Sequence, residues 1–142
     1  MNMEDNINKM QKYYRGENPR ELSSLVLAYI GDAVYEMLVR VHVLSFGNAP
    51  VNKLHRKSST IVKAQAQKET YLKIEELLTE EEQAVFKRGR NAKSNTVPKN
   101  ADLMDYKFAT GFEAVFGYLY LKGEVDRLNY LFNEGVINEK GN

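Results

Sequence analysis

The amino-acid sequence predicts an all-α domain. Apolar residues recur at spacings of three and four along several long segments, which is the period of a helix that faces a core. Capping signals precede these segments, and the sequence shows no convincing alternation of apolar and polar residues, which a half-buried strand would need. The chain has 142 residues, a length that suits one domain. We therefore expect a single helical domain at 18–134, flanked by a polar N-terminal segment, 1–17, and a polar C-terminal tail, 135–142.

The first predicted helix starts after Asn18, which can cap it. Pro19 suits the first helical position, and Glu21 can complete a capping box. Gly47 is expected to end this helix, because glycine readily adopts the left-handed conformation that follows many helices. The apolar residues that define its period are Leu22, Leu25, Val26, Tyr29, Ile30, Ala33, Met37, Leu38, Val41 and Leu44.

A second predicted helix is capped by Asn52 and reaches Leu78, with one break along its length. Its apolar residues keep the helical period, and its other face is basic. The basic character extends beyond this helix, because Asp and Glu are absent from 37–68.

A shorter helix follows, for which Thr79 and Glu82 form a capping-box pattern. We expect it to reach about Arg88, with Gly89 as its stop signal. Residues 89–100 contain glycine, proline and three asparagines without an apolar period, so we interpret them as a loop.

Two more helices complete the predicted domain. Asp102 can cap a long helix that continues to Leu121 and ends at Gly123. The last helix is expected to run from about Val125 to Phe132.

The composition excludes several classes of site. The chain has a formal net charge of +1 and no cysteine, which excludes disulfides, thiolate zinc sites and cysteine nucleophiles. Its polar start lacks the apolar core of a secretory signal, and no apolar run approaches the roughly 20 residues of a membrane span. We expect a cytoplasmic protein without membrane contact.

Two carboxylates interrupt otherwise uncharged helices. Asp32 is the only charged residue in the stretch 22–35, and Glu113 is the only charged residue in the stretch 108–121. An ionised carboxylate in apolar surroundings must be paired, hydrated, protonated or bound to a metal. Each carboxylate also has a glycine close to it in sequence, Gly31 and Gly117, and a glycine inside a helix suggests close approach of another backbone.

These features are explained together if the two helices cross and their carboxylates share a divalent cation. Magnesium suits such a site, because it prefers oxygen ligands and is often held by one or two carboxylates with water and substrate phosphate. Asp32 and Glu113 are therefore candidate metal ligands and catalytic residues, and Glu36 is a candidate accessory group. The alternative is structural: Asp32 pairs with an Arg or Lys, and Glu113 caps a neighbouring helix.

A second acid-free stretch, 83–101, holds five cations among neutral hydrogen-bonding residues. Such a mixture suits phosphate and sugar contacts, which position a nucleic acid without reading its sequence. Aromatic residues are absent from the predicted loop, so a duplex held by its backbone and 2′-hydroxyls fits better than a stacked single strand. The alternative is a solvated charged surface. The candidate RNA-binding residues are Lys87, Arg88, Arg90, Asn91, Lys93, Ser94 and Lys99.

Three motifs resemble those of a known nuclease family. Residues 29–36, YIGDAVYE, resemble the ribonuclease III signature, which reads approximately FLGDAVLE, and residues 111–121, GFEAVFGYLYL, resemble its second acidic motif. Residues 87–94, KRGRNAKS, and the TVPKN that follows are similar to the basic loop of the Mini-III ribonuclease subfamily. The resemblance runs from about residue 22 to residue 131.

This resemblance implies an all-helical endonuclease domain that forms a homodimer and lacks the usual double-stranded-RNA-binding domain. It implies magnesium-dependent hydrolysis of double-stranded RNA, with Asp32 and Glu113 as catalytic metal ligands and with 5′-phosphate and 3′-hydroxyl ends as products. The substrate of the subfamily is precursor 23S ribosomal RNA of the large subunit. A large-subunit ribosomal protein that presents this RNA is a candidate partner.

The sequence departs from the wider ribonuclease III pattern at two acidic positions, which are Ala28 and Thr110 here. The subfamily shares this loss, so we expect one metal whose shell is completed by phosphate. A different class stays open: a non-catalytic helical module that binds structured RNA in ribosome assembly, with its carboxylates in ion pairs.

Overall fold

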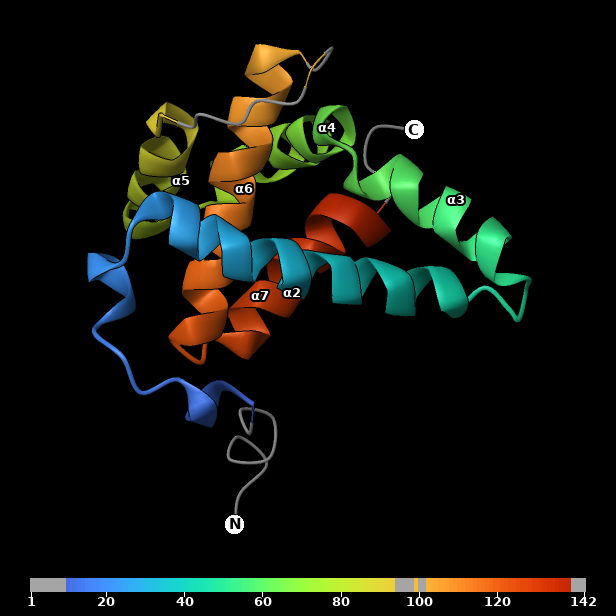
Figure 1. Cartoon of the computed structure of the whole chain (residues 1–142), viewed down its shortest axis with the longest axis horizontal. Helices are drawn as coiled ribbons and strands as arrows, with labels where there is room; N and C mark the ends of the chain where they lie inside the picture. Colours follow the sequence, from blue (N-terminus) through green and yellow to red (C-terminus); the bar gives the residue numbers. More distant parts are fainter. Residues whose placement is uncertain (1–9, 94–98, 100–101, 139–142) are drawn as a thin grey trace.

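The computed structural model of the chain describes residues 10–93, 99 and 102–138, and every element in them is helical (Figure 1). This confirms the all-α prediction. The same residues include no helix that combines the length and the apolar character needed to cross a bilayer. The longer helices are α2 Ser24–Leu44, α3 Val51–Val62, α4 Ala64–Ile74, α5 Glu80–Asn91, α6 Leu103–Leu121 and α7 Val125–Phe132, and the short elements are η1 Gln11–Tyr13, η2 Pro19–Glu21, η3 Glu75–Leu77 and η4 Asn133–Ile137.

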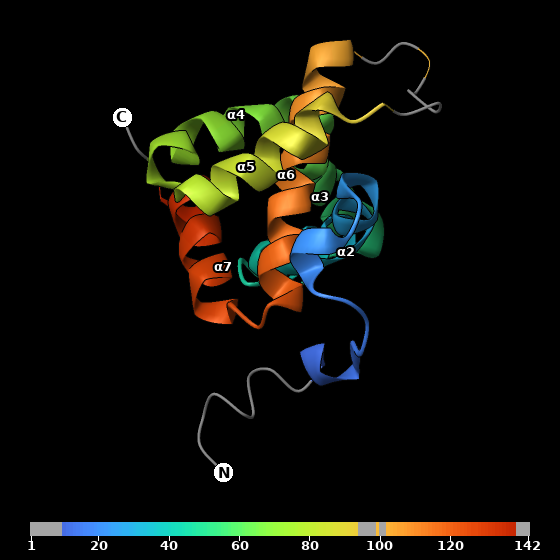
Figure 2. The same ribbon diagram turned by 90° about the vertical axis from the view of Figure 1, so that its left-hand side faces the viewer.

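Helix α6 lies at the centre of the molecule. It contacts α2, α4, α5 and α7, and Figures 1 and 2 show α3 and α5 on opposite sides of it. Tyr35 of α2 meets two rings of α6 edge to face, with centroid distances of 5.0 Å to Phe112 and 5.4 Å to Phe116. All three side chains are buried, so they supply much of the apolar area that holds α2 against α6.

Two glycines allow α2 and α6 to cross in backbone contact. A Cβ atom on Gly31 would lie 1.7 Å from the carbonyl oxygen of Glu113. A Cβ atom on Gly117 would lie 2.0 Å from the carbonyl oxygen of Leu27. A side chain at either position would have to push the helices apart. The close approach predicted at these glycines is therefore confirmed, and the approaching segments are the helices that carry Asp32 and Glu113.

The predicted start of the first long helix is wrong. Asn18 does accept a hydrogen bond from the backbone N–H of Arg20, but the turn that it caps, η2, ends at Glu21. Leu22 is then extended and packs against the core, and Ser23 caps α2. The apolar contact of Leu22 thus interrupts what the spacing alone presents as one helix.

In the structure the second predicted helix begins before its expected cap, and it is broken along its length as expected. Pro50, not Asn52, precedes the first residue of α3, and its fixed φ of −57° suits that position. The predicted break is confirmed at Lys63, whose ψ of 153° is extended and separates α3 from α4. The junction of α3 and α4 forms one wall of the site described below.

The prediction that Gly89 stops α5 is wrong. The helix continues to Asn91, and Gly89 is buried within it. A Cβ atom on Gly89 would lie 2.8 Å from the Cα atom of Gly111 in α6. The glycine therefore serves the packing of α5 on α6 and not a helix end. As a result Arg90 and Asn91, which were expected in a loop, belong to the helix.

Neither of the first two predicted helices ends where the sequence suggested. Gly47 lies three residues beyond the last residue of α2, Leu44, and α4 ends at Ile74 before the short turn η3.

The start of α5, both ends of α6 and the bounds of α7 agree with the sequence. Thr79 and Glu82 form a reciprocal capping box at the start of α5. Asp102 caps α6 by accepting a hydrogen bond from the backbone N–H of Asp105, at 3.0 Å. Gly123 follows α6 with a positive φ of 80°. The bounds of α7 are those predicted.

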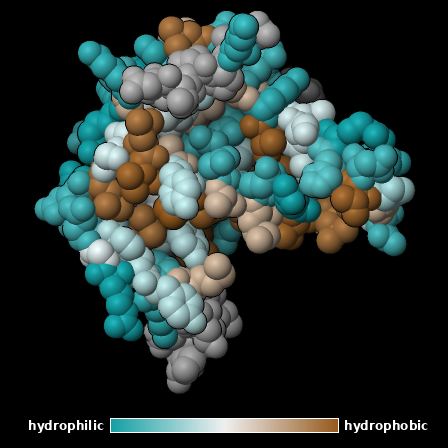
Figure 3. All heavy atoms as spheres, viewed as in Figure 1, coloured by the Kyte–Doolittle hydropathy of each residue, from teal (hydrophilic) through white to brown (hydrophobic). Residues whose placement is uncertain are grey.

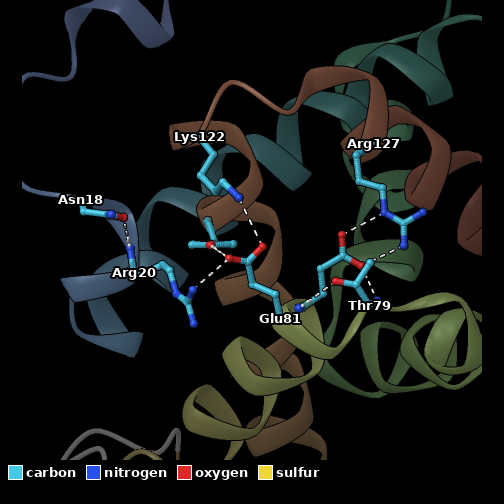
Figure 4. Close-up of polar contacts among 8 residues, drawn as sticks. Asn18, Arg20, Thr79, Glu81, Lys122 and Arg127 are labelled. Atoms are coloured by element: carbon cyan, nitrogen blue, oxygen red, sulfur yellow. Dashed lines mark hydrogen bonds and ion pairs between the residues drawn. The ribbon is translucent and has the colours of Figure 1, made fainter.

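Acidic residues in the first turn of α5 fasten this helix to other segments (Figure 4). Glu81 accepts a hydrogen bond from the Tyr118 hydroxyl at 2.6 Å. It also forms ion pairs with Lys122, at 3.3 Å, and with Arg20, at 3.5 Å. Its neighbour Glu82 is bound to α7. These contacts fix the start of α5 and hence the direction of its basic end.

Candidate active site

The two carboxylates singled out by the sequence lie in one cavity. Its volume is about 290 Å³, and it opens between α2, α6 and the junction of α3 with α4. Asp32 of α2 and Glu113 of α6 line it together with Tyr29 and Gln67. One water occupies about 30 Å³ of liquid, so the cavity has room for several. The structure thus brings together two residues that are far apart in the chain.

The crossing of α2 and α6 positions these carboxylates. Asp32 directly follows Gly31, and the backbone atom that Gly31 approaches most closely belongs to Glu113. Both residues sit on regular helices, which hold functional groups more firmly than loops do. The separation of the two side chains is therefore set by the helix crossing.

The Glu113 carboxyl group is mostly withdrawn from solvent, whereas Asp32 is exposed. Burial raises the pKa of Glu113, a hydrogen bond from Gln67 opposes this, and the negative charge of Asp32 raises it further, to about 8. None of the ion pairs within the described residues includes Asp32 or Glu113. The structural pairing with Arg or Lys is therefore not seen there.

This donor set fits a magnesium ion. Two carboxylates that repel each other across a cavity are stabilised by a shared cation. Magnesium needs only one or two carboxylates, because water and substrate phosphate supply its other oxygen ligands. In the part of the chain that the structure describes, His, Cys, Asp and Glu form no cluster of three or more that could enclose a metal. The site therefore suits an ion that is shared with the substrate.

Two neutral residues occupy the wall of the cavity at the positions where the wider ribonuclease III pattern has acids. Ala28 and Thr110 both line the cavity. The Thr110 hydroxyl donates a hydrogen bond to the carbonyl oxygen of Tyr106, at 2.9 Å. Neither side chain adds a charged oxygen ligand.

Glu36, the candidate accessory group, lies one turn after Asp32 on α2. It forms an ion pair with Arg40, at 3.4 Å. It is not among the described residues that line the cavity. The structure thus holds it on the helix surface near the site.

The candidate RNA-binding residues lie at the end of α5 and just beyond it. Lys87, Arg88, Lys93 and Lys99 are exposed. Arg90 is partly buried, with its guanidinium 5.7 Å from the centroid of the Phe86 ring. Its Nε donates a hydrogen bond to the side chain of Asn91, at 3.3 Å. Ser94 lies outside the described residues.

The basic face that the sequence predicts for the second helix lies on α3. Lys53, Arg56 and Lys57 are exposed on one face of this helix, whose opposite face packs on the core through Leu54 and Ile61. Figure 3 shows hydrophilic residues beside smaller hydrophobic areas on this part of the molecule. Because α3 and α5 lie on opposite sides of α6, exposed cations flank the helix that carries Glu113 (Figures 1 and 2).

Sequence reasoning missed Gln67, a polar residue that lines the cavity beside Glu113. Its Nε2 donates a hydrogen bond to Oε2 of Glu113, at 3.2 Å. A signal existed: Gln67 shares the inward face of its helix with Thr70, Tyr71 and Ile74, which are all buried. A polar amide among core positions could have marked it.

Comparison with known proteins identifies a family. The ribonuclease III domain family matches residues 25–124. Three relatives are called Mini-ribonuclease 3. The relative from Clostridium tetani is 52% identical, and the match covers 91% of this chain and 89% of the relative. The relative from Thermoanaerobacter sp. is 49% identical, with 84% of each chain covered, and the one from Enterococcus faecalis is 45% identical, with 85% of this chain and 97% of the relative covered. A crystal structure of a Fusobacterium nucleatum protein has a TM-score of 0.74 at 34% identity and covers 83% of this chain and 94% of that one.

Proposed function

The chain belongs to the ribonuclease III family, in its Mini-ribonuclease 3 group, and from this premise we propose how it cuts double-stranded RNA. Asp32 and Glu113 hold one magnesium ion between them and form the catalytic site. The observation that carries this proposal is their shared cavity, which has no Arg or Lys among its described lining residues. Because no cationic side chain lies there, a bound metal ion would supply the positive charge that balances the two carboxylates.

Asp32 and Glu113, which both line the cavity, would hold the ion through their carboxylate oxygens, and magnesium commonly takes its other ligands from water and substrate phosphate. A magnesium ion held by Asp32 and Glu113 would supply the means to activate water for in-line attack on phosphorus and to offset the charge that develops on the phosphate. The products carry 5′-phosphate and 3′-hydroxyl ends. Because Ala28 and Thr110 offer no charged oxygen, one ion per site is favoured over two.

The basic surfaces bind the backbone of the RNA duplex. Cations beside hydrogen-bonding side chains suit phosphate and ribose contacts. Helix α5 packs on α6 where Gly89 meets Gly111, next to Thr110 of the cavity wall. The residues assigned to the RNA contact are Lys87, Arg88, Arg90, Asn91, Lys93, Ser94 and Lys99, with the exposed cations of α3 on the other side.

The substrate that we propose is a duplex stem of precursor 23S ribosomal RNA, the substrate that the resemblance to the Mini-III subfamily implies. A large-subunit ribosomal protein is the candidate partner that presents this stem, and the cytoplasm is the expected location. Duplex contacts through backbone alone leave the choice of cleavage position to RNA shape or to such a partner.

The active form is a homodimer that uses the exposed apolar face of α2. Four large side chains on this face, Val26, Tyr29, Met37 and Val41, are between 46% and 76% exposed. A helix that faced only water would be polar there. A two-fold pair across this face supplies two carboxylate sites, one for each strand of a duplex.

The test uses the full chain and end-labelled duplex RNA that carries a precursor 23S stem. The RNA is incubated with magnesium or with a chelator and resolved on a denaturing gel. We expect discrete products only with magnesium. Asp32→Asn and Glu113→Gln should keep the helical circular dichroism and the shift of RNA on a native gel, yet abolish cleavage.

Glu69→Gln is the matched control, because Glu69 is an exposed carboxylate of α4 that does not line the cavity. This variant should cut at the parental rate. Parental cleavage by Asp32→Asn would remove Asp32 from the mechanism. RNA that is bound but intact in every lane would favour the non-catalytic RNA-binding module.

A further inference from the structure

Gln67 is held by two hydrogen bonds, both donated by the Nε2 atom of its side-chain amide. Its side chain is only 3% exposed. The Nε2 atom donates one hydrogen bond to the carbonyl oxygen of Val62, at 2.8 Å, and another to Oε2 of Glu113, at 3.2 Å. Both neighbours are acceptors, so the opposite amide orientation would bring three oxygens together. The amide therefore has one chemically sensible orientation.

The first anchor exists because of the break between α3 and α4. In a continuous helix the Val62 carbonyl would accept a hydrogen bond from the backbone four residues later. The chain turns at Lys63 instead, and the last carbonyls of α3 need other donors. Gln67 supplies one of these from the first turn of α4, and this contact fixes its side chain relative to the junction.

The buried side-chain amide of Gln67 lowers the stability of the fold at this position. Among the described residues its Oε1 atom is buried without a hydrogen-bond partner. An apolar side chain of similar shape would avoid leaving a buried oxygen unpaired. What the amide provides in return is its two donated hydrogen bonds, which connect the α3–α4 junction to the Glu113 carboxylate.

We propose that Gln67 is a positioning residue of the nuclease site. Its amide holds the Glu113 carboxylate in the orientation that lets Glu113 share a divalent cation with Asp32. This inference rests on the proposed function, because it concerns the same cavity. Partners that orient metal ligands in this way commonly change metal affinity or activity by about 10-fold to 100-fold when they are lost.

The test compares Gln67→Met, which keeps the length of the side chain and removes both donors, with Thr70→Val. Thr70 is a buried polar residue one turn further on α4 and does not line the cavity. Magnesium is titrated against each chain in two ways: by the rise in thermal unfolding temperature without RNA, and by the single-turnover cleavage rate of duplex RNA. Asp32→Asn and Glu113→Gln are measured alongside.

We expect Gln67→Met to need about 10-fold or more magnesium for both effects, with unchanged duplex affinity in chelator. Thr70→Val should show the parental magnesium midpoint. A parental midpoint and rate in Gln67→Met, while Asp32→Asn and Glu113→Gln are inactive, would overturn the role of Gln67 and leave the proposed function intact. Parental cleavage by Asp32→Asn and Glu113→Gln would overturn the proposed function itself.

A second measurement does not depend on whether Gln67→Met folds. In the parental chain, the side-chain amide protons of Gln67 should exchange slowly with solvent and change their nuclear magnetic resonance shift when magnesium is added. In Asp32→Asn this magnesium-dependent change should be lost. An amide signal that stays fixed at saturating magnesium would overturn the inference.

Discussion

A methyl group added at Gly31 tests how the carboxylates are positioned. Helix propensity alone favours alanine over glycine by about 1 kcal/mol inside a helix. The contact predicts the opposite, because the new Cβ would meet the Glu113 carbonyl oxygen and overpacking costs about 1–3 kcal/mol or more. We expect Gly31→Ala to lower the free energy of unfolding by about 2 kcal/mol in a urea titration.

Ala84→Gly provides the comparison for this prediction. Ala84 is exposed within α5, away from the apolar face of α2, so its replacement should cost only the propensity difference of about 1 kcal/mol. If Gly31→Ala instead stabilised the protein by about that amount, the helices would not be in contact at this point. The backbone crossing could then not be what sets the distance between Asp32 and Glu113.

Glu82 predicts how stability depends on pH. Burial raises its pKa, but hydrogen bonds from Arg127 and from the backbone of Thr79 outweigh burial, and the net pKa lies below its usual value. A carboxyl group of this kind stabilises the fold above its unfolded pKa, and the contribution is lost as pH falls through the folded pKa. Stability of the parental chain should therefore decline below about pH 5.

Glu82→Gln checks this sign, because glutamine preserves the capping-box pattern without the charge. The side chain of Glu82 is 4% exposed, so we expect a loss of about 1–3 kcal/mol at pH 7 and a weaker decline towards acid. Urea titrations at pH 7 and below about pH 5 measure the free energy of unfolding of each chain. Glu80→Gln, at an exposed position of the same turn, should keep the parental profile. A parental decline in Glu82→Gln would assign acid sensitivity to other groups.

At the scale of elements, the sequence predicts best what local chemistry decides. Thr79 with Glu82 and Asp102 mark the starts of α5 and α6, because a cap needs only residues a few positions apart. The bounds of α7 follow from local spacing in the same way. Asp32 and Glu113 could also be predicted, because the sequence alone shows an isolated charge within an apolar helix.

Features that depend on a distant segment were not predictable in this way. Gly89 has the sequence appearance of a helix stop, and only its contact with Gly111 of α6 explains why the helix continues. Gln67 looks like an ordinary polar residue until the turn at Lys63 brings its amide to Glu113. Both cases involve tertiary contacts that override local preference.

The exposed cations of α3 are expected to contribute measurably to the affinity for duplex RNA. Arg56 and Lys57 are exposed and take part in none of the ion pairs of the described residues. Each cation that contacts a phosphate adds about one unit to the slope of log affinity against log salt. The double variant Arg56→Gln/Lys57→Gln should therefore reduce that slope by about one to two units, measured by duplex binding in chelator at several salt concentrations.

Lys73→Gln is the control for this surface, because Lys73 is an exposed cation on α4. It should leave the slope unchanged. An unchanged slope in the α3 variant as well would make the α3 face a solvated surface, and the α5 end alone would then carry the backbone contact.

At the scale of the whole molecule, one chain offers one carboxylate site to a substrate with two strands. The exposed apolar face of α2 provides a way to pair two chains. Met37 and Val41 of this face also border a groove of about 680 Å³ towards α7. Hydrophobic residues along the part of α2 below α3 are visible in Figure 3. An exposed apolar surface of this kind is typical of an interface between proteins.

Met37→Glu/Val41→Glu should therefore separate the dimer. A charge on each side of a two-fold apolar contact faces its own copy, and burying unpaired charges is strongly unfavourable. We expect the parental chain to sediment as a dimer and the variant as a monomer with unchanged circular dichroism. Leu72→Glu, at a 52% exposed leucine of α4, should remain dimeric.

Because the monomer keeps its cavity but loses the second site, it should release nicked duplex before double-strand breaks. A variant that stays dimeric would move the interface to another face, and a parental monomer would require the two strands to be cut in separate encounters.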